Sequence, residues 1–229
     1  MWWRALGVAV VLLCVGVAGG YAVADRNQEE AASSTTLEPI PGVSPAVPTP
    51  VVPSYAPDPD DPPLTTSGLV AEPVKLRLNP DGAGVKADIP VGWRENRPED
   101  TNFWNFVDPD ASQGTYVLRV TLWRPANVSI AAAMAQRIAA LEDAETHGGL
   151  SDFHVTAQSD DTMEATYVDG GHLRFTTERW VSFDGSTAYA SVAVTGREVD
   201  RPGLGDLLSR TVTSLRELPP KPPGGNDQG

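Results

Sequence analysis

The sequence predicts an α+β domain in which an antiparallel β-sheet carries two main helices. The apolar residues recur in a pattern that gives two groups of four strands, and each group is followed by a helix. The expected strands are joined by turns rich in Gly, Asp and Pro, which favour hairpins. The strands and helices do not alternate one by one, as a parallel sheet would require.

The first 24 residues form a separate hydrophobic segment. Residues 5–24 carry no charge and follow Arg4. As a helix this stretch is about 30 Å long, which is enough to cross a bilayer. We expect residues 1–24 to be a single-pass transmembrane anchor in the cell membrane, with the acidic residues that follow lying outside the cytoplasm.

Two alternatives remain for this segment. Ala22-Val23-Ala24 fits a signal-peptide cleavage site, and cleavage between Ala24 and Asp25 gives a secreted protein. Cys14, the only cysteine, suggests a lipoprotein, although Leu13 stands where a lipidation signal needs a small residue. In all three cases the rest of the chain lies outside the cytoplasm.

Residues 25–68 are predicted to be a disordered, proline-rich spacer. Ten of the 21 prolines lie between Pro39 and Pro63, and the segment has no apolar periodicity. Such a segment cannot bury enough apolar surface to offset its loss of conformational entropy. Its prolines favour an extended chain, so its expected role is to hold the domain away from the membrane. Residues 219–229 are expected to be a disordered tail rich in Pro and Gly.

The globular domain is expected over residues 69–218. Its first group of strands is predicted at residues 74–78, 84–89, 103–108 and 115–123. A helix from Ser129 to Glu145 follows, because Ser129 suits the N-cap. Apolar side chains recur on one stripe of this helix, namely Ile130, Met134, Ile138 and Leu141.

The second group begins with a strand at residues 153–159 and continues into two hairpins. A three-residue loop, Asp169-Gly170-Gly171, is predicted to pair Tyr167 with Leu173. A two-residue loop, Asp184-Gly185, is predicted to place Trp180 opposite Tyr189.

Asp200 is expected to cap the last helix, whose apolar face carries Leu204, Leu207, Leu208, Val212 and Leu215.

Three short motifs and the two helices resemble a known family. The motifs are VKADIPVGW at residues 85–93, FVDP at 106–109 and ERW at 178–180. They resemble exported actinobacterial proteins of the Mog1/PsbP-like fold, the LpqN-type lipoproteins among them, over about residues 74–217. The resemblance implies an α/β/α sandwich in a cell-envelope protein without a known catalytic motif. Because the chain lacks a convincing lipobox, lipidation is not carried over.

Composition excludes several kinds of partner and site. The formal net charge is −13, from 17 basic and 30 acidic side chains. This balance argues against nucleic acid and against an anionic lipid surface, because both need clustered Lys and Arg. A single cysteine excludes an internal disulfide and a thiolate metal site. The membrane is therefore expected as a partner only through residues 5–24.

No pattern in the sequence predicts a catalytic, cofactor or metal site. His147, His154 and His172 lack the spacing of metal ligands. Asp108-x-Asp110-x-Ser112 has oxygen ligands at the spacing of a calcium loop, but Arg119 stands where a glutamate should close the shell. There is no Gly-x-Ser-x-Gly nucleophile turn and no glycine-rich phosphate loop. We therefore expect a protein that is not an enzyme.

The best candidate for recognition is one face of the second hairpin, with Trp180, Tyr189, Arg174 and Glu178. The two aromatic residues either pack beneath a helix layer or serve as exposed contact anchors. The sequence thus predicts a binding or interaction module for an unknown protein or small ligand outside the membrane. The alternatives are an enzyme with a dispersed site and a purely structural envelope protein.

Overall fold

The computed structural model describes residues 55–56, 58, 60–123 and 127–221. The expected anchor or signal peptide, residues 1–24, lies outside this part, as do most of the spacer and the end of the tail. Among the described residues, no helix is both long enough and apolar enough to span a membrane.

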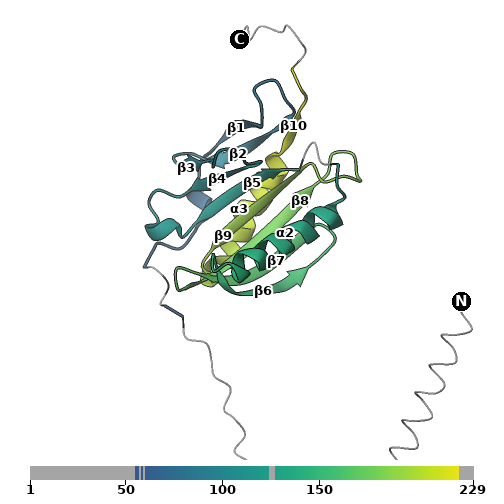
Figure 1. The fold of residues 1–229 in the computed structure, drawn as a ribbon. Coiled ribbons are helices and arrows are strands. Elements are labelled where there is room, and N and C mark those ends of the chain that lie inside the picture. The colour runs from purple at the N-terminus through teal and green to yellow at the C-terminus, as the bar shows by residue number, and fades with distance from the viewer. Residues whose placement is uncertain (1–54, 57, 59, 124–126, 222–229) are drawn as a thin grey trace, which may run out of the picture. The chain divides into compact units, whose positions relative to one another are not determined.

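A seven-stranded antiparallel sheet forms the middle of the domain, with the strand order β3-β4-β5-β9-β8-β7-β6 (Figure 1). Its strands are β3 (Arg94–Asn96), β4 (Phe103–Val107), β5 (Val117–Leu122), β6 (Ser151–Gln158), β7 (Thr162–Asp169), β8 (His172–Val181) and β9 (Ala190–Gly196). A second antiparallel sheet has the order β1-β2-β10 and consists of β1 (Ala71–Arg77), β2 (Gly84–Pro90) and β10 (Arg216–Leu218).

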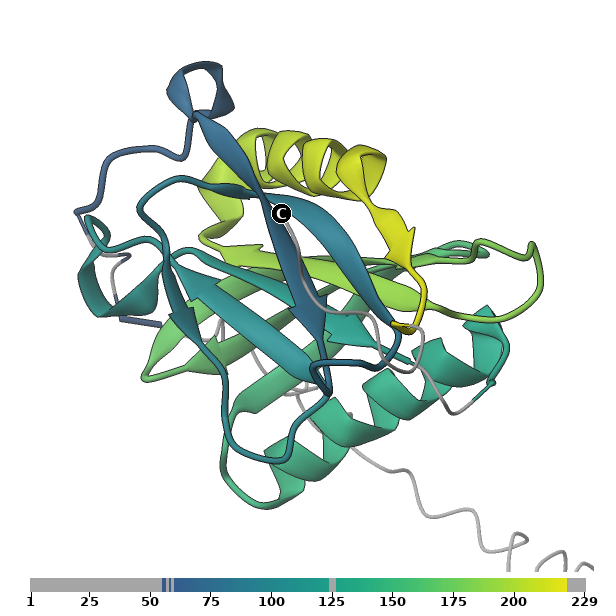
Figure 2. The same cartoon turned by 90° about the horizontal axis from the view of Figure 1, so that it is seen from above.

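Two α-helices lie on opposite faces of the seven-stranded sheet, α2 (Ile130–Thr146) on one and α3 (Arg201–Ser214) on the other (Figure 2). The smaller sheet packs on the same face as α3, since the core there combines Val85 and Ile89 of β2, Leu204 of α3 and Val192 of β9. The core beneath α2 is smaller and contains Ala133, Met134, Leu141, Phe153, Met163, Ala165, Trp180 and Ala188. The predicted α+β class, an antiparallel sheet with two helices packed on it, is confirmed.

Both helices begin where their sequence signals predict, but only α2 has a side-chain capping bond. Ser129 caps α2 through its side-chain oxygen, which accepts the N–H of Ala132 at 3.2 Å. Asp200 stands at the N-cap of α3, but its carboxylate makes no capping bond. The carboxylate of Asp200 instead forms an ion pair with Arg197. Arg197 is buried, and a buried guanidinium needs a negatively charged partner.

The first hairpin has a two-residue turn rather than the expected three-residue loop. Gly170 and Gly171 both have positive φ angles, 59° and 85°. Two consecutive residues of this kind form the tight turn whose twist matches the flanking strands. Asp169 therefore pairs with His172, and Tyr167 pairs with Arg174 instead of Leu173.

The second hairpin has a longer loop than expected, because β8 ends at Val181 and β9 begins at Ala190. The side chain of Asp184 accepts the backbone N–H groups of Ser186 and Thr187, each at 2.8 Å. These bonds stabilise a wide loop in place of the predicted two-residue turn.

As a result, Trp180 lies opposite Ser191 and not opposite Tyr189. The expected register is therefore wrong by two residues, a shift that keeps each β9 residue on its predicted face.

The ordered domain also begins before the expected boundary at residue 69. Asp61 and Leu64, which the prediction assigns to the disordered spacer, are both buried against the domain. Two short strands, β3 and β10, were not predicted, and they pair with β4 and β2 respectively.

Candidate functional site: a polar cleft lined by arginines

A cavity of about 280 Å³ opens on the α2 face of the seven-stranded sheet. Three arginines from three different elements line it: Arg119 of β5, Arg137 of α2 and Arg174 of β8. Neutral polar side chains, among them Asn96 and Asn105, complete much of the lining. In a chain with a net charge of −13, three arginines around one cavity form a local cationic site, and the exposed Asp169 is the one acidic residue that also lines the cavity.

The register of the sheet explains where the cleft forms. Asn105 pairs with Arg119, Arg119 pairs with Ala193 and Ala193 pairs with Glu178, so these residues make one row across four strands. The β9 residue in this row, Ala193, has a small side chain. Thr195, the next β9 residue on the same face, also lines the cavity. The small side chains of the central strand leave room between the longer ones on either side.

Arg137 is held at one wall of the cleft by a buried carboxylate. Its Nε donates to Oε2 of Glu178 at 3.0 Å, and Glu178 is only 2% exposed. The other oxygen of Glu178 accepts the hydroxyl of Ser191 at 2.6 Å. The indole N–H of Trp123 donates to the Ser191 oxygen at 3.0 Å, which completes the chain. The charge of Arg137 is thus compensated within the protein.

Arg119 lies across the sheet from this pair and is fixed on two sides. Its Nε donates to Oδ1 of Asn105 at 2.8 Å, and its guanidinium carbon lies 4.7 Å from the ring centre of Phe103. Burial lowers the pKa of Arg119 from its ordinary value, and the nearby charge of Arg137 lowers it further. The charge of Glu178 acts in the opposite direction and raises the pKa of this half-buried side chain.

Arg174 is the most unusual residue of the cleft. It is only 5% exposed, and its Nη1 has no hydrogen-bond partner among the described residues. A buried, unpaired charged nitrogen is unfavourable, because the protein has removed its water without replacing the hydrogen bond. An anion in the cleft would supply the missing acceptor.

The four residues of the predicted recognition face are not brought together. Arg174 lines the cleft, and Glu178 lies beside it through its pair with Arg137. Trp180 is 1% exposed in the core beneath α2. Tyr189 packs in the core of the opposite face, where its hydroxyl donates to the carbonyl oxygen of Gly84 at 3.1 Å. Both aromatic residues therefore pack in the core, and neither is an exposed contact anchor.

Arg119 and Arg137 were missed, although the sequence carries a signal for each. Arg119 stands between Leu118 and Val120 in a strand, so it points away from the core that these two residues enter. Arg137 falls three residues after Met134 and thus on the apolar stripe of its helix, where a charge needs a partner. What the sequence does not show is that the two arginines meet.

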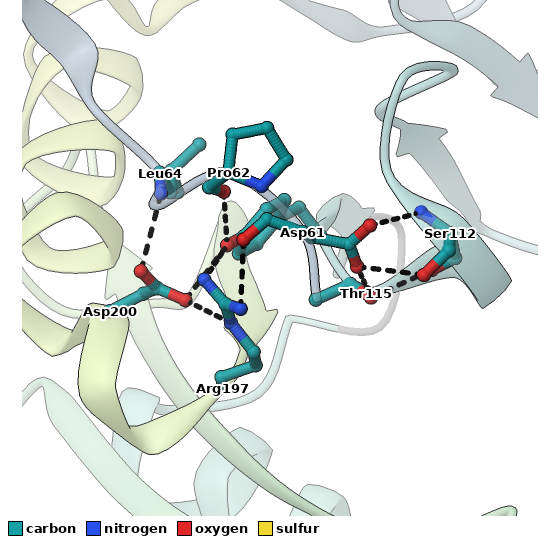
Figure 3. Close-up of polar contacts among 8 residues, drawn as sticks. Asp61, Pro62, Leu64, Ser112, Thr115, Arg197 and Asp200 are labelled. Atoms are coloured by element: carbon teal, nitrogen blue, oxygen red, sulfur yellow. Dashed lines mark hydrogen bonds and ion pairs between the residues drawn. The ribbon is translucent and has the colours of Figure 1, made fainter. Parts of the chain in front are cut away.

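A second buried polar cluster joins residues 61–64 to the domain (Figure 3). Arg197 donates to Oδ2 of Asp200 at 2.6 Å, to the carbonyl oxygen of Asp61 at 3.0 Å and to the hydroxyl of Tyr116 at 2.8 Å. Asp200 also accepts the N–H of Leu64 at 3.2 Å. Burial and the bond to Asp200 raise the pKa of Tyr116, so its hydroxyl stays neutral.

The carboxylate of Asp61 is equally well satisfied. It accepts the N–H of Ser112 at 2.7 Å, the hydroxyl of Ser112 at 3.0 Å and the hydroxyl of Thr115 at 2.5 Å. Because its charged groups bond to one another and to the backbone, this second cluster serves to hold the segment, in contrast to the arginine cleft.

The remaining sequence candidates have local roles. Asp108 accepts the N–H of Asp110 at 3.0 Å, which is the bond of a turn. His147 closes the end of α2, where its Nδ1 lies 2.8 Å from the carbonyl oxygen of Asp143. Within the described ranges no three metal-ligating side chains gather.

Comparison with known proteins gives similarity in fold. No protein-family model matches the chain, and no curated protein sequence matches it. The Ran-binding protein Mog1p of Saccharomyces cerevisiae is 8% identical and aligns with 64% of this chain and 96% of its own, with a TM-score of 0.40. The cyanobacterial PsbP of Synechocystis is 13% identical and aligns with 67% of this chain and 97% of its own, with a TM-score of 0.43.

LpqN of Mycobacterium tuberculosis, a protein involved in cell envelope biogenesis, is 11% identical. It aligns with 65% of this chain and 92% of its own, with a TM-score of 0.37. Mog1, PsbP and LpqN are the proteins whose fold the sequence motifs indicate.

Proposed function

We propose that this chain is a non-enzymatic binding module, held outside a membrane, whose cleft takes an anionic group of its ligand. The main support for the proposal is the environment of Arg174, a buried arginine in a cleft that two further arginines line, whose Nη1 has no hydrogen-bond partner in the described part of the chain. A carboxylate or a phosphate offers the acceptor oxygens that this nitrogen needs.

The chemistry of the cleft favours recognition over catalysis. Guanidinium groups stay protonated and only donate hydrogen bonds, so they hold an anion but do not transfer protons. The carboxylate of Glu178 accepts from Arg137 and from Ser191, one on each oxygen. Its oxygens are therefore engaged and poorly placed to act as a general base.

The location outside a membrane is proposed from the sequence. Residues 5–24 have the length and composition of a membrane-spanning helix, and the proline-rich stretch that follows suits a spacer. The intact mass of the native protein tests this part. A mass that retains residues 1–24 supports an anchored module, whereas a chain that begins at Asp25 is a secreted one.

The binding proposal is tested by calorimetric titration of the full chain, in non-ionic detergent, with phosphate, sulfate, citrate and acetate. We expect saturable binding of at least one anion, weakened about tenfold or more by Arg174→Met. Arg179→Met is the matched control, because Arg179 lies on the same strand but on its other face, 45% exposed and paired with Asp161.

Three results would contradict the proposal. The binding site would be wrong if Arg174→Met and Arg179→Met had the same effect, or if none of the four anions bound. The non-enzymatic part would be wrong if the chain hydrolysed a phosphate or carboxylate ester and lost this activity with Arg174→Met.

A further inference from the structure

The charges around the cleft set the charge of the group that it can hold. Three arginines line the cavity, and the buried carboxylate of Glu178 pairs with one of them, Arg137. Asp169 also lines the cavity but is exposed at the end of β7, where solvent screens it. Arg119 and Arg174 remain without a carboxylate partner among the described residues. A buried cation, Arg174, and a half-buried one, Arg119, are best matched by a ligand group with two negative charges.

The donors that remain on these arginines suit a group with several oxygens. Arg119 uses its Nε for Asn105, and its stacking on Phe103 fixes the plane of the guanidinium. The Nη1 of Arg174 has no hydrogen-bond partner within the ranges that the structure describes. Two guanidinium groups that approach one centre need three or more acceptor oxygens between them, which a phosphate provides and a single carboxylate does not.

The polar part of the remaining lining suits a hydroxylated body, and Val107 and Val117 add apolar surface. Asn96, Asn105, Tyr167 and Thr195 carry amide or hydroxyl groups, and Ala193 keeps the floor low. Amides and hydroxyls both donate and accept hydrogen bonds, so they can pair with the hydroxyl groups of a glycerol or a sugar.

From these observations we infer that the cleft binds a phosphate monoester in its doubly charged form, with Arg119 and Arg174 as the groups that bind the phosphate. The inference rests on the proposed function and names the class of its ligand. A diester, which has one charge and two blocked oxygens, leaves one cation unmatched. A monocarboxylate also has one charge, so it too leaves one of the two arginines without a matching negative charge.

Ionisation of the ligand gives the decisive test. A phosphate monoester loses its second proton with a pKa of about 6, so it is mainly singly charged at about pH 5 and doubly charged at about pH 7.5. We expect glycerol 3-phosphate to bind the full chain about tenfold more tightly at the higher pH. Dimethyl phosphate, a diester, should bind weakly at both.

Sulfate controls for titration of the protein itself, because it is doubly charged at both pH values. The ionisable groups that line the cleft are the three arginines, Tyr167 and Asp169, with Glu178 behind Arg137. His172 is the next residue on the same face of β8 as Arg174. If protonation of His172 changed the affinity of the cleft, it would change the affinity for sulfate as well as that for glycerol 3-phosphate.

The variants assign the site. Arg119→Met and Arg174→Met should each weaken glycerol 3-phosphate about tenfold or more, and Arg179→Met should leave it unchanged. The comparison of the monoester with sulfate and dimethyl phosphate uses the native chain, so it decides the charge of the ligand even if a variant does not fold. Equal affinity for glycerol 3-phosphate at both pH values, or equal affinity for dimethyl phosphate, overturns the inference.

The four anions also distinguish a wrong ligand class from a wrong binding site. If citrate or acetate binds in an Arg174-dependent manner and the monoester does not bind, the inference of a phosphate ligand is wrong. The proposed function as an anion-binding module is then still supported. A soluble monoester and a lipid headgroup share the same chemistry. Tighter binding of dioctanoyl phosphatidic acid assigns the ligand to a membrane, and tighter binding of glycerol 3-phosphate assigns it to solution.

Discussion

Arg137 of α2 and Glu178 of β8 form a partly buried ion pair with a nitrogen-to-oxygen distance of 3.0 Å, and this pair ties the helix to the sheet beside the cleft. The pair joins residues that lie 41 positions apart in the chain. Because Glu178 neutralises one of the three arginines, it sets how much positive charge is left for a ligand.

Replacement of Glu178 by Gln should therefore strengthen anion binding. Glutamine keeps an oxygen that can accept the Ser191 hydroxyl, but it frees the charge of Arg137. We expect sulfate to bind several-fold more tightly and the domain to lose about 1–3 kcal/mol of stability, the usual cost of impairing a buried hydrogen bond. Calorimetry and urea unfolding measure the two effects. Weaker sulfate binding would show that Arg137 must be held by Glu178 for the cleft to form.

Replacement of Trp180 by Ala should cost about 3–5 kcal/mol of stability, because the side chain is 1% exposed in the core beneath α2. Phe183→Ala is the control, since Phe183 is 39% exposed, and it should cost about 1 kcal/mol or less. Urea unfolding followed by fluorescence and circular dichroism gives both values. A loss as small as that of Phe183→Ala would mean that α2 does not cover Trp180 in solution.

The main strands and both helices could be predicted, because their apolar residues follow the periods of strand and helix. The turn lengths could not be derived in the same way. Gly170 and Gly171 permit several loops, and the choice depends on both adopting positive φ. Asp184 sets its loop through bonds of its side chain, which a count of loop residues does not reveal.

The two short strands and residues 61–64 were missed for a related reason. All three residues of β3 are exposed, so the strand has no apolar pattern and exists through its pairing with β4. Asp61 and Leu64 lie among prolines whose composition is that of a spacer. Their burial depends on partners more than 50 positions away, such as Thr115 for Asp61.

The candidate site could be predicted only in part. Arg174 and Glu178 were selected because they lie on the polar face of a predicted strand. Arg119 and Arg137 are brought to the same cavity by the register of β5 and by the position of α2 over the sheet. Convergence of this kind depends on the order of strands, which periodicity within each strand does not determine.

Acid should weaken the attachment of residues 61–64. Burial alone would raise the pKa of Asp61, but the hydrogen bonds from Thr115 and Ser112 outweigh it and lower the pKa below its ordinary value of 3.8. A lowered pKa means that the unfolded chain binds the proton more readily. The contribution of Asp61 to stability is therefore complete above about pH 4 and is lost as the pH falls through the lowered value.

Urea unfolding between about pH 2 and pH 6 tests this effect, with Asp61→Asn as the comparison. The variant should be less stable than the native chain at about pH 6 and should approach it at about pH 2. Curves that stay parallel over the whole range would mean that Asp61 has the same pKa in the folded and unfolded states.

Two glycines of α3 give the final prediction, on the packing of residues 61–64 against the helix. A Cβ atom at Gly203 would lie 2.0 Å from the carbonyl oxygen of Leu64, so Gly203→Ala must displace the backbone there. We expect a loss of about 2–3 kcal/mol, in the range for overpacking a buried site. A Cβ at Gly205 meets no atom within 4 Å. Gly205→Ala should therefore stabilise the domain by up to about 1 kcal/mol, which is the advantage in helix propensity of Ala over Gly.

Hydrogen exchange at the backbone N–H of Leu64 distinguishes the two variants. This N–H is bonded to Asp200, so its exchange should accelerate only in Gly203→Ala. If both variants stabilised the domain equally, residues 61–64 would not lie on α3 in solution.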